Sequence, residues 1–210
     1  SSASLGAITK RDLSQVESVK DKDEFYGVLL GFNVTVPTDI GEYCKAKGLK
    51  VIVHDVIYRT IEEYESYISG LKKEIELREL ASLVRPCKFL VMKGYTFRQN
   101  NPAISGVEIE VGKIKSGDPI MSREGKRLTI VKSMKEGQDN VTVAEQGKQL
   151  AMAMDDITIG RQVQEGDFLY TDISEEHFKK LKELKKYLSK NEVEVLKEIA
   201  EIKRRENPVW

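Results

Sequence analysis

The first third of the chain alternates apolar runs with a helical segment. Tyr26–Val34 is a continuous apolar run of strand length, a helix is expected from Pro37 to Gly48, and Val51–Val53 is a second apolar run. Strand, helix and strand in this order predict parallel strands joined by a right-handed crossover. A run without alternation is typical of a strand that is covered on both faces. We expect an α/β domain over residues 1–55.

The next segment has the periodicity of a long helix. Asp55–Val84 contains no proline. Its apolar residues recur at steps of 4, 3, 4, 3 and 4, which places them on one side of a helix: Ile57, Ile61, Tyr64, Ile68, Leu71 and Ile75. Charges become dense around and after Ile75, so we expect a helix that is docked at its start and exposed at its end. The pattern predicts a long connecting helix over residues 56–84.

Strand-like alternation begins after Pro86. Tyr95–Arg98 and Gly106–Val111 flank a polar loop at Gln99–Pro102, and turn residues then recur at intervals of about 8–12 positions. Such spacing is typical of a small antiparallel barrel, expected over residues 85–173. The later strands are expected at Arg127–Met134, Asn140–Ala144, Gln149–Met154 and Asp167–Asp172.

The chain becomes helical again over residues 174–210. Ser174 is the expected N-cap of a helix that reaches Leu188. Asn191 and Glu194 have capping-box spacing, which predicts the start of a second helix. Both helices have an apolar face, and we expect them to form a hairpin against the barrel.

Composition excludes several classes of protein. Among 210 residues, 40% are apolar and 34 positive residues balance 34 negative ones, so a single broad basic face for nucleic acid is not expected. No stretch is apolar enough to span a membrane, and Ser1–Gly6 lacks the layout of a signal peptide. Cys44 and Cys87 are far apart and the two histidines are isolated. We expect a cytoplasmic protein with no metal site and no disulfide.

Catalytic motifs are missing as well. A phosphate-binding loop needs glycine five residues before a Gly-Lys pair that Ser or Thr follows, and none of the three Gly-Lys pairs fits. No histidine or cysteine forms a catalytic pair with a carboxylate, so no catalytic residue is assigned. Between Lys179 and Lys190, six lysines accompany the single acid Glu183. They are either a solvated helix face or a contact for phosphates.

Four segments resemble translation initiation factor 5B of archaea and eukaryotes, the counterpart of bacterial initiation factor 2. They are Thr9-Lys10-Arg11-Asp12, Val51–Glu63, Gly94–Met121 and Gly160–Tyr170, in the order in which that family has them. The resemblance implies a C-terminal fragment with part of the third domain, the connecting helix and the fourth domain. The implied fold is a partial parallel α/β/α sandwich followed by an elongation-factor-like β-barrel with a C-terminal helical hairpin.

The resemblance also implies a function. The family is a GTPase that promotes ribosomal subunit joining, and its GTP and Mg²⁺ belong to a G domain absent here, so no cofactor is expected in this fragment. The implied partners are the ribosome, initiator Met-tRNA and initiation factor 1A, with no membrane. The barrel would bind the tRNA acceptor end. The bacterial counterpart has a Lys-Arg-aromatic run and a cysteine where this chain reads Lys132-Ser133-Met134-Lys135 and Gln149-Leu150.

Candidate residues follow by position on that resemblance. Those for tRNA are Arg98, Lys132, Lys135, Gln149 and Arg161, each with the alternative of an ordinary solvated barrel residue. Those for initiation factor 1A are Lys182, Leu184, Lys185, Lys186, Leu188, Leu196 and Ile199. The alternative function is a stand-alone small-molecule-binding α/β protein with a β-barrel attachment. A dinucleotide site would need a glycine-rich turn after a strand, which neither strand-to-helix turn contains.

Overall fold

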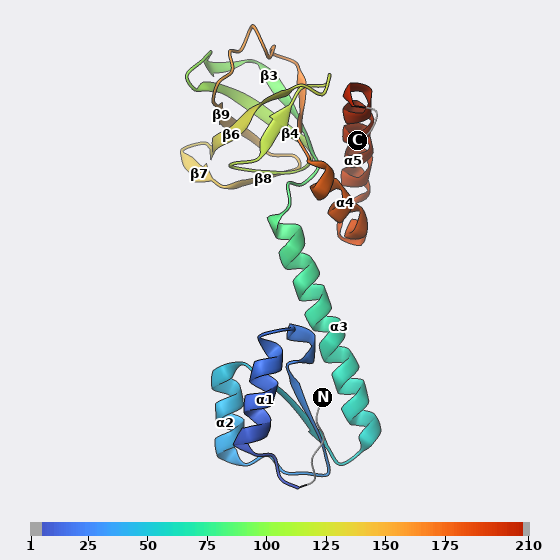
Figure 1. Ribbon diagram of the computed structural model, residues 1–210. Helices are drawn as coiled ribbons and strands as arrows, with labels where there is room; N and C mark the ends of the chain where they lie inside the picture. Colours follow the sequence, from blue (N-terminus) through green and yellow to red (C-terminus); the bar gives the residue numbers. More distant parts are fainter. Residues whose placement is uncertain (1–5, 208–210) are drawn as a thin grey trace. The chain divides into compact units, whose positions relative to one another are not determined.

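A computed structural model describes residues 6–207 of the chain (Figure 1). Five of the six residues considered for a signal peptide lie outside this range. The chain divides into two compact units, Ser1–Arg78 and Glu79–Trp210, and the boundary falls inside one helix, α3. Each unit has its own hydrophobic cluster of buried residues. The two units are therefore described separately.

The first unit is a small α/β structure. Its two strands are parallel, with Leu30 opposite Ile52, and α2 crosses between them. Thr9 caps α1 through a capping box with Asp12, and Gly48 ends α2 with φ 60°. The elements in chain order are α1 (Lys10–Lys20), the 3₁₀ turn η1 (Glu24–Tyr26), β1 (Val28–Phe32), α2 (Thr38–Lys47), β2 (Lys50–His54) and α3 (Ile57–Ser82).

The two faces of the short sheet differ in burial. Leu29 packs on the cluster formed by Leu13, Ile40 and other residues of the helices. Leu30 and Phe32 point the other way, and about half of their surface stays exposed. The expectation that this strand is covered on both faces is therefore wrong. A continuous apolar run indicates that both faces of a strand are apolar. It does not indicate how much of each face other elements cover.

Helix α3 is continuous over 26 residues. At a rise of 1.5 Å per residue it is ~39 Å long. Its beginning interacts with β2, because Glu63 accepts from Lys50 Nζ at 2.8 Å and lies 2.7 Å from His54 Nε2. The expectation that the helix is docked at its start and exposed at its end is wrong. Ile57 and Ile61 at the start are nearly half exposed, whereas Leu80 at the end is buried in the apolar cluster of the second unit.

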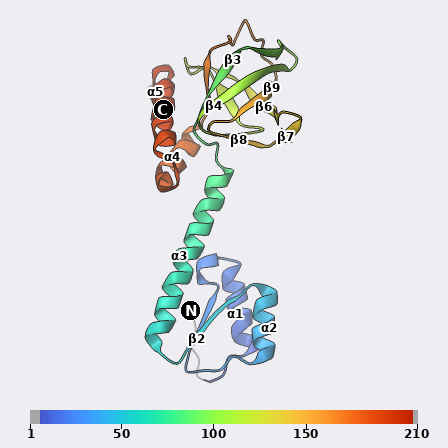
Figure 2. The ribbon, with the colours of Figure 1, turned by 180° about the vertical axis from the view of Figure 1, so that it is seen from behind.

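The second unit is a closed antiparallel barrel with helices packed on its outside (Figures 1 and 2). Six strands follow one another in the order β3-β10-β5-β6-β9-β4, and pairing of β4 with β3 closes the ring. The strands are β3 (Cys87–Arg98), β4 (Ala103–Lys115), β5 (Pro119–Met121), β6 (Arg127–Glu136), β7 (Asp139–Val141), β8 (Val143–Glu145), β9 (Gln149–Met154) and β10 (Phe168–Thr171).

One expected strand is divided in two. Asn140–Ala144 was expected as a single strand, but β7 pairs with the end of β6 and β8 pairs with the end of β4. The backbone changes partner near Thr142, whose carbonyl accepts from Ser116 N–H at 3.0 Å. A period-2 pattern does not show which neighbour a strand pairs with, so the division was not visible in the sequence.

The C-terminal helices pack on the barrel (Figure 2). They are α4 (Glu175–Glu183), the 3₁₀ turn η2 (Lys185–Tyr187) and α5 (Lys190–Glu206). Leu181, Leu196 and Ile199 share a buried cluster with Met121 and Tyr170 of the barrel. The expected hairpin packed against the barrel is therefore confirmed.

The start of α5 differs from the expectation. The capping box uses Ser189 and Glu192, not Asn191 and Glu194, and the first helix ends at Glu183 rather than Leu188. Both candidate pairs have the right spacing for a capping box. The structure uses the pair that contains Glu192, because this carboxylate also accepts a hydrogen bond from Arg85, 107 residues earlier in the chain.

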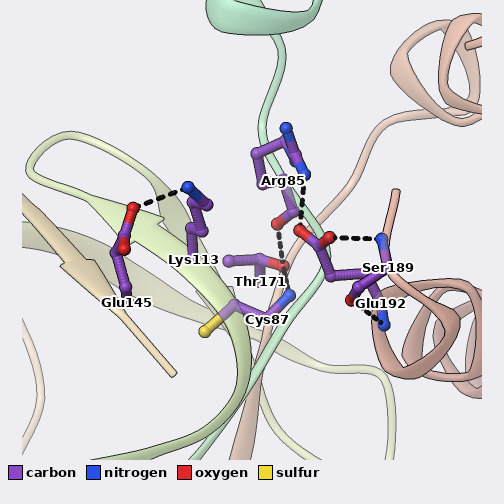
Figure 3. Close-up of polar contacts among 7 residues, drawn as sticks. All are labelled: Arg85, Cys87, Lys113, Glu145, Thr171, Ser189 and Glu192. Atoms are coloured by element: carbon purple, nitrogen blue, oxygen red, sulfur yellow. Dashed lines mark hydrogen bonds and ion pairs between the residues drawn. The ribbon is translucent and has the colours of Figure 1, made fainter. Parts of the chain in front are cut away.

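Arg85 and Glu192 form a buried junction between the segment after α3 and the start of α5 (Figure 3). Arg85 Nη2 donates to Glu192 Oε1 at 2.6 Å, and the side chains are 12% and 6% exposed. The other Glu192 oxygen accepts from Ser189 N–H at 2.8 Å. Thr171 Oγ1 donates to the Arg85 carbonyl at 2.8 Å and accepts from Cys87 N–H at 3.0 Å. The junction therefore joins three segments of the second unit.

We predict that Arg85→Met destabilises the protein by about 3–5 kcal/mol, because it leaves the buried Glu192 carboxylate without its counter-ion. Adding Glu192→Gln should recover part of this loss, since glutamine keeps the capping-box geometry and carries no charge. Urea unfolding of the parent and of the two variants measures both changes in the free energy of unfolding.

The control is Lys113→Met. Lys113 pairs with Glu145 across β4 and β8 at 2.6 Å, but the two side chains are 43% and 61% exposed (Figure 3). An exposed pair contributes about 0–1 kcal/mol. Equal losses for Arg85→Met and Lys113→Met would contradict the special role of the buried junction.

Candidate nucleic-acid interface

A bulge in β6 turns its polar side chains outward. Val131 is opposite Met154 and Ser133 is opposite Ala153, so β6 has one extra residue, Lys132, between two matched positions. Without a bulge, Lys132 would share a face with the buried Met134. The bulge leaves Val131 and Met134 inside, and it exposes Lys132, Ser133 and Lys135.

Small residues lie beside this edge of β6. Lys135 is opposite Ala151, and Ala151 is opposite Gly106 of β4. One row further, Ser133 is opposite Ala153, which is opposite Ile104, which is opposite Arg98. Apart from Ile104, these two rows of the outer face carry short side chains between their edges, and we call them the floor: Gly106, Ser133, Ala151 and Ala153. Lys132 and Lys135 border it on one side, and the end of β3 borders it on the other.

The end of β3 lies over this floor. A Cβ atom on Gly106 would be 2.8 Å from Tyr95 Cβ, so Gly106 gives Tyr95 the space that it occupies. Glu165 accepts from Gly94 N–H at 2.9 Å and from Thr96 Oγ1 at 2.6 Å, which holds this part of β3. The Thr96 hydrogen bond lowers the pKa of Glu165, so its carboxyl group is an anionic acceptor at neutral pH.

The structure places three of the predicted tRNA residues on this outer face or next to it: Arg98, Lys132 and Arg161. Arg98 ends β3, and its Nη1 donates to the Asn101 carbonyl at 3.4 Å. Lys132 Nζ pairs with Asp155 at 3.0 Å. The turn that carries Arg161 is tied to the residue after Arg98, because Ile159 N–H donates to the Gln99 carbonyl at 2.9 Å.

Lys135 and Gln149 lie further along the same face. Gln149 is opposite Glu108 of β4, two positions beyond Ala151. All five predicted side chains are exposed: Arg98, Lys132, Lys135, Gln149 and Arg161. Their juxtaposition fits a surface that contacts phosphates, but whether they bind tRNA stays a prediction.

Two residues of this face were not selected from the sequence. Tyr95 and Phe97 are 53% and 66% exposed on the outside of the barrel. In the sequence they look like two positions of an alternating strand, which usually point into a core. No signal in the sequence shows that β3 leaves the regular register before Thr96.

The predicted partner-binding residues divide into two groups. Leu184, Leu196 and Ile199 are buried and Leu188 is partly buried, all within the cluster that holds α4 and α5 on the barrel. These side chains pack in the core, so they have little surface left with which to contact a partner. The lysines are on the surface: Lys182, Lys185 and Lys186.

A hollow of about 330 Å³ lies where α5 meets the barrel. Lys88 lies in it, with its Nζ 5.2 Å from the centre of the Phe168 ring and 3.2 Å from Glu198 Oε2. Arg123 and Arg205 also line the hollow. It contains charges of both signs next to an aromatic ring.

Both cysteines, Cys44 and Cys87, are buried and unpaired by a disulfide. No group of three or more His, Cys, Asp or Glu residues within residues 6–207 could hold a metal ion. Cys87 is completely buried, and burial raises the pKa of its thiol well above the ordinary value. Such a thiol stays protonated and unreactive. Across the same range, every helix is too short or too polar to cross a membrane.

Two family models match the chain. Residues 85–170 match elongation factor Tu domain 4, and residues 1–65 match translation-initiation factor 2. The first match covers the strands of the barrel, and the second covers the α/β unit with the start of α3.

Individual proteins match nearly the whole chain. The probable translation initiation factor IF-2 of Ignicoccus hospitalis is 40% identical over 210 residues, which is 99% of this chain and 34% of that protein. The protein of the same name in Thermococcus sibiricus is 36% identical over 99% of this chain. The crystal structure of GDP-bound aIF5B from Aeropyrum pernix covers 96% of this chain and 34% of its own, with 38% identity and a TM-score of 0.62.

These matches confirm the resemblance that the four sequence segments indicated. The chain spans about a third of the length of the curated relatives it matches. The alternative of a stand-alone small-molecule-binding protein gains no support from them.

Proposed function

We propose that this chain, a member of the archaeal and eukaryotic initiation factor 5B family, is the C-terminal module of a cytoplasmic translation initiation GTPase that promotes ribosomal subunit joining. The observation that supports this most is identity of about 40% over 99% of the chain with an initiation factor. The match includes both units, so the proposal concerns the module as a whole. Its partners are the ribosome, initiator Met-tRNA and initiation factor 1A.

The barrel binds the acceptor end of initiator Met-tRNA through the outer face of β6, β9 and β4. Arg98, Lys132 and Lys135 lie around a floor of short side chains on that face. Cations at the edge of such a face contact phosphates, and the low floor admits an unpaired strand. Gln149 and Arg161 extend the same contact at its two ends.

We predict that replacing Arg98, Lys132 and Lys135 together by alanine weakens binding of initiator Met-tRNA and flattens its salt dependence. Three lost contacts to a single strand should reduce the slope of log K against log salt by roughly two units. Fluorescence anisotropy at several salt concentrations measures the slope.

The matched control replaces Lys22, Lys72 and Lys73, three exposed lysines of the first unit, by alanine. It removes the same charge from a different surface and should leave the slope near that of the parent. An unchanged slope in the barrel variant would place the tRNA contact elsewhere.

The C-terminal helices bind initiation factor 1A. Lys182, Lys185 and Lys186 are surface residues of α4 and η2, and the hollow between α5 and the barrel opens in the same unit. The lysines favour an acidic segment, and a short apolar residue of that segment would enter beside Phe168. The buried leucines contribute indirectly, because they hold the helices in place.

We predict that Lys182→Glu, Lys185→Glu and Lys186→Glu together weaken binding of the C-terminal tail peptide of initiation factor 1A. The difference from the parent should grow as salt is lowered, because screening is then least. Circular dichroism should stay unchanged, since the three side chains are exposed. Isothermal titration against the same charge reversal at Lys22, Lys72 and Lys73 separates a local contact from net charge. Parent-like affinity at low salt would refute the basic helix as docking surface.

This chain alone does not hydrolyse GTP, because the phosphate-binding loop, with its GTP and Mg²⁺, belongs to a G domain outside it. We predict no release of phosphate from GTP above a buffer blank. Release that survives repurification and rises in proportion to the concentration of the chain would show that a nucleotide site exists in the fragment.

A further inference from the structure

Tyr95 and Phe97 are the most exposed large apolar side chains of the second unit within the described range, at 53% and 66%. A single exposed apolar residue is ordinary in a soluble protein. Both rings are exposed on β3, and Phe97 lies in the register shift between Thr96 and Arg98. Two exposed rings this close in the chain form a larger apolar surface of the kind that marks interaction sites.

The backbone that carries the rings is held in place. Between Val91 and Thr96, β3 advances five residues while its partner β4 advances two, so the intervening residues bulge outward. Glu165 accepts from Gly94 N–H and Thr96 Oγ1 within this segment. Tyr95 lies over Gly106 in space that a Cβ atom would fill, with Met92 Sδ beside it. The rings are therefore presented by a fixed scaffold, which lowers the entropy lost on binding.

Cations and short side chains surround the rings. Arg98 follows Phe97 directly, and Lys135 lies across Gly106 and Ala151, about two strand spacings or ~10 Å from Gly106. In that row only Gly106 and Ala151 lie between Tyr95 and Lys135, and both side chains are small. Aromatic faces bordered by cations complement a ligand that has flat apolar rings and negative charges. An apolar peptide could offer apolar rings but not the negative charges.

We infer that Tyr95 and Phe97 are a stacking platform for the unpaired bases at the 3′ end of an RNA, whose phosphates run toward Arg98 and Lys135. Bases stack on exposed aromatic side chains, and the phosphates provide the charge that the cations neutralise. The inference rests on the proposed function and adds to it the residues that hold the bases. Positively charged residues fix the strand, and the two rings fix its unpaired end.

The test uses the full chain and initiator tRNA with 2-aminopurine in place of the 3′-terminal adenine. Stacking quenches this base, so the parent should lower its fluorescence on binding. Tyr95→Ala with Phe97→Ala should abolish the quenching and reduce affinity by roughly fivefold or more for each base that loses its ring. The salt slope should stay that of the parent, because no charge is removed. Tyr58→Ala, which removes a 74% exposed ring from the first unit, is the matched control.

The outcomes separate the inference from the proposed function. If the parent binds tRNA and the double variant binds and quenches equally well, the stacking platform is wrong while the proposed function stands. If the double variant loses equal affinity for tRNA whose unpaired 3′ nucleotides have been removed, the rings contact something else, and the inference is again overturned. If the parent itself does not bind, the proposed tRNA contact fails first. Phe97→Ala alone, at the more exposed ring, repeats the test should the double variant unfold.

Discussion

Closure of the barrel is the constraint on which the candidate interface depends. Six strands close into a ring only with staggered registers. Among the register shifts of this barrel, two bear on the candidate interface: one in β3 before Thr96 and one in β6 at Lys132. Each shift reverses the direction of the side chains that follow it. The bulge in β6 puts Lys132 and Lys135 on the same outer surface, and the bulge in β3 puts Tyr95 there as well. The geometry that completes the core therefore also places the polar and aromatic residues outside.

A second constraint acts where the chain enters and leaves the barrel. Arg85 lies just before β3, and Glu192 lies in the first turn of α5, 107 residues later. Because both side chains are nearly buried, neither can be removed alone without leaving a desolvated group unpaired. Arg85 Nε already has no hydrogen-bond partner within residues 6–207, so the Arg85–Glu192 junction has little tolerance for the loss of another hydrogen bond. This junction holds the C-terminal helices, and hence their lysines, at a defined place on the barrel.

The predicted sites illustrate how far the sequence could lead. Charged side chains such as Arg98 and Lys182 remain at the surface in almost any fold, so their exposure could be expected from residue type alone. Apolar residues are ambiguous. Leu184, Leu196 and Ile199 were candidates for binding initiation factor 1A, and in the structure they pack α4 and α5 on the barrel. Tyr95 and Phe97 belong to an alternating segment whose faces the sequence did not assign, and both are exposed. Burial depends on which neighbour covers a face, and the sequence does not name the neighbour.

The sequence by itself determined the local elements and their kinds. Thr9 and Gly48 mark the ends of helices through hydrogen bonding and positive φ, and the proline-free stripe specifies α3, because these effects act within a few residues. The tertiary structure alone decided the partners. It divided the segment after β6 between two strands, chose Glu192 over Glu194 for the capping box, and turned Lys132 and Tyr95 to one face. Those choices depend on contacts between residues far apart in the chain, and no pattern over a short window contains them.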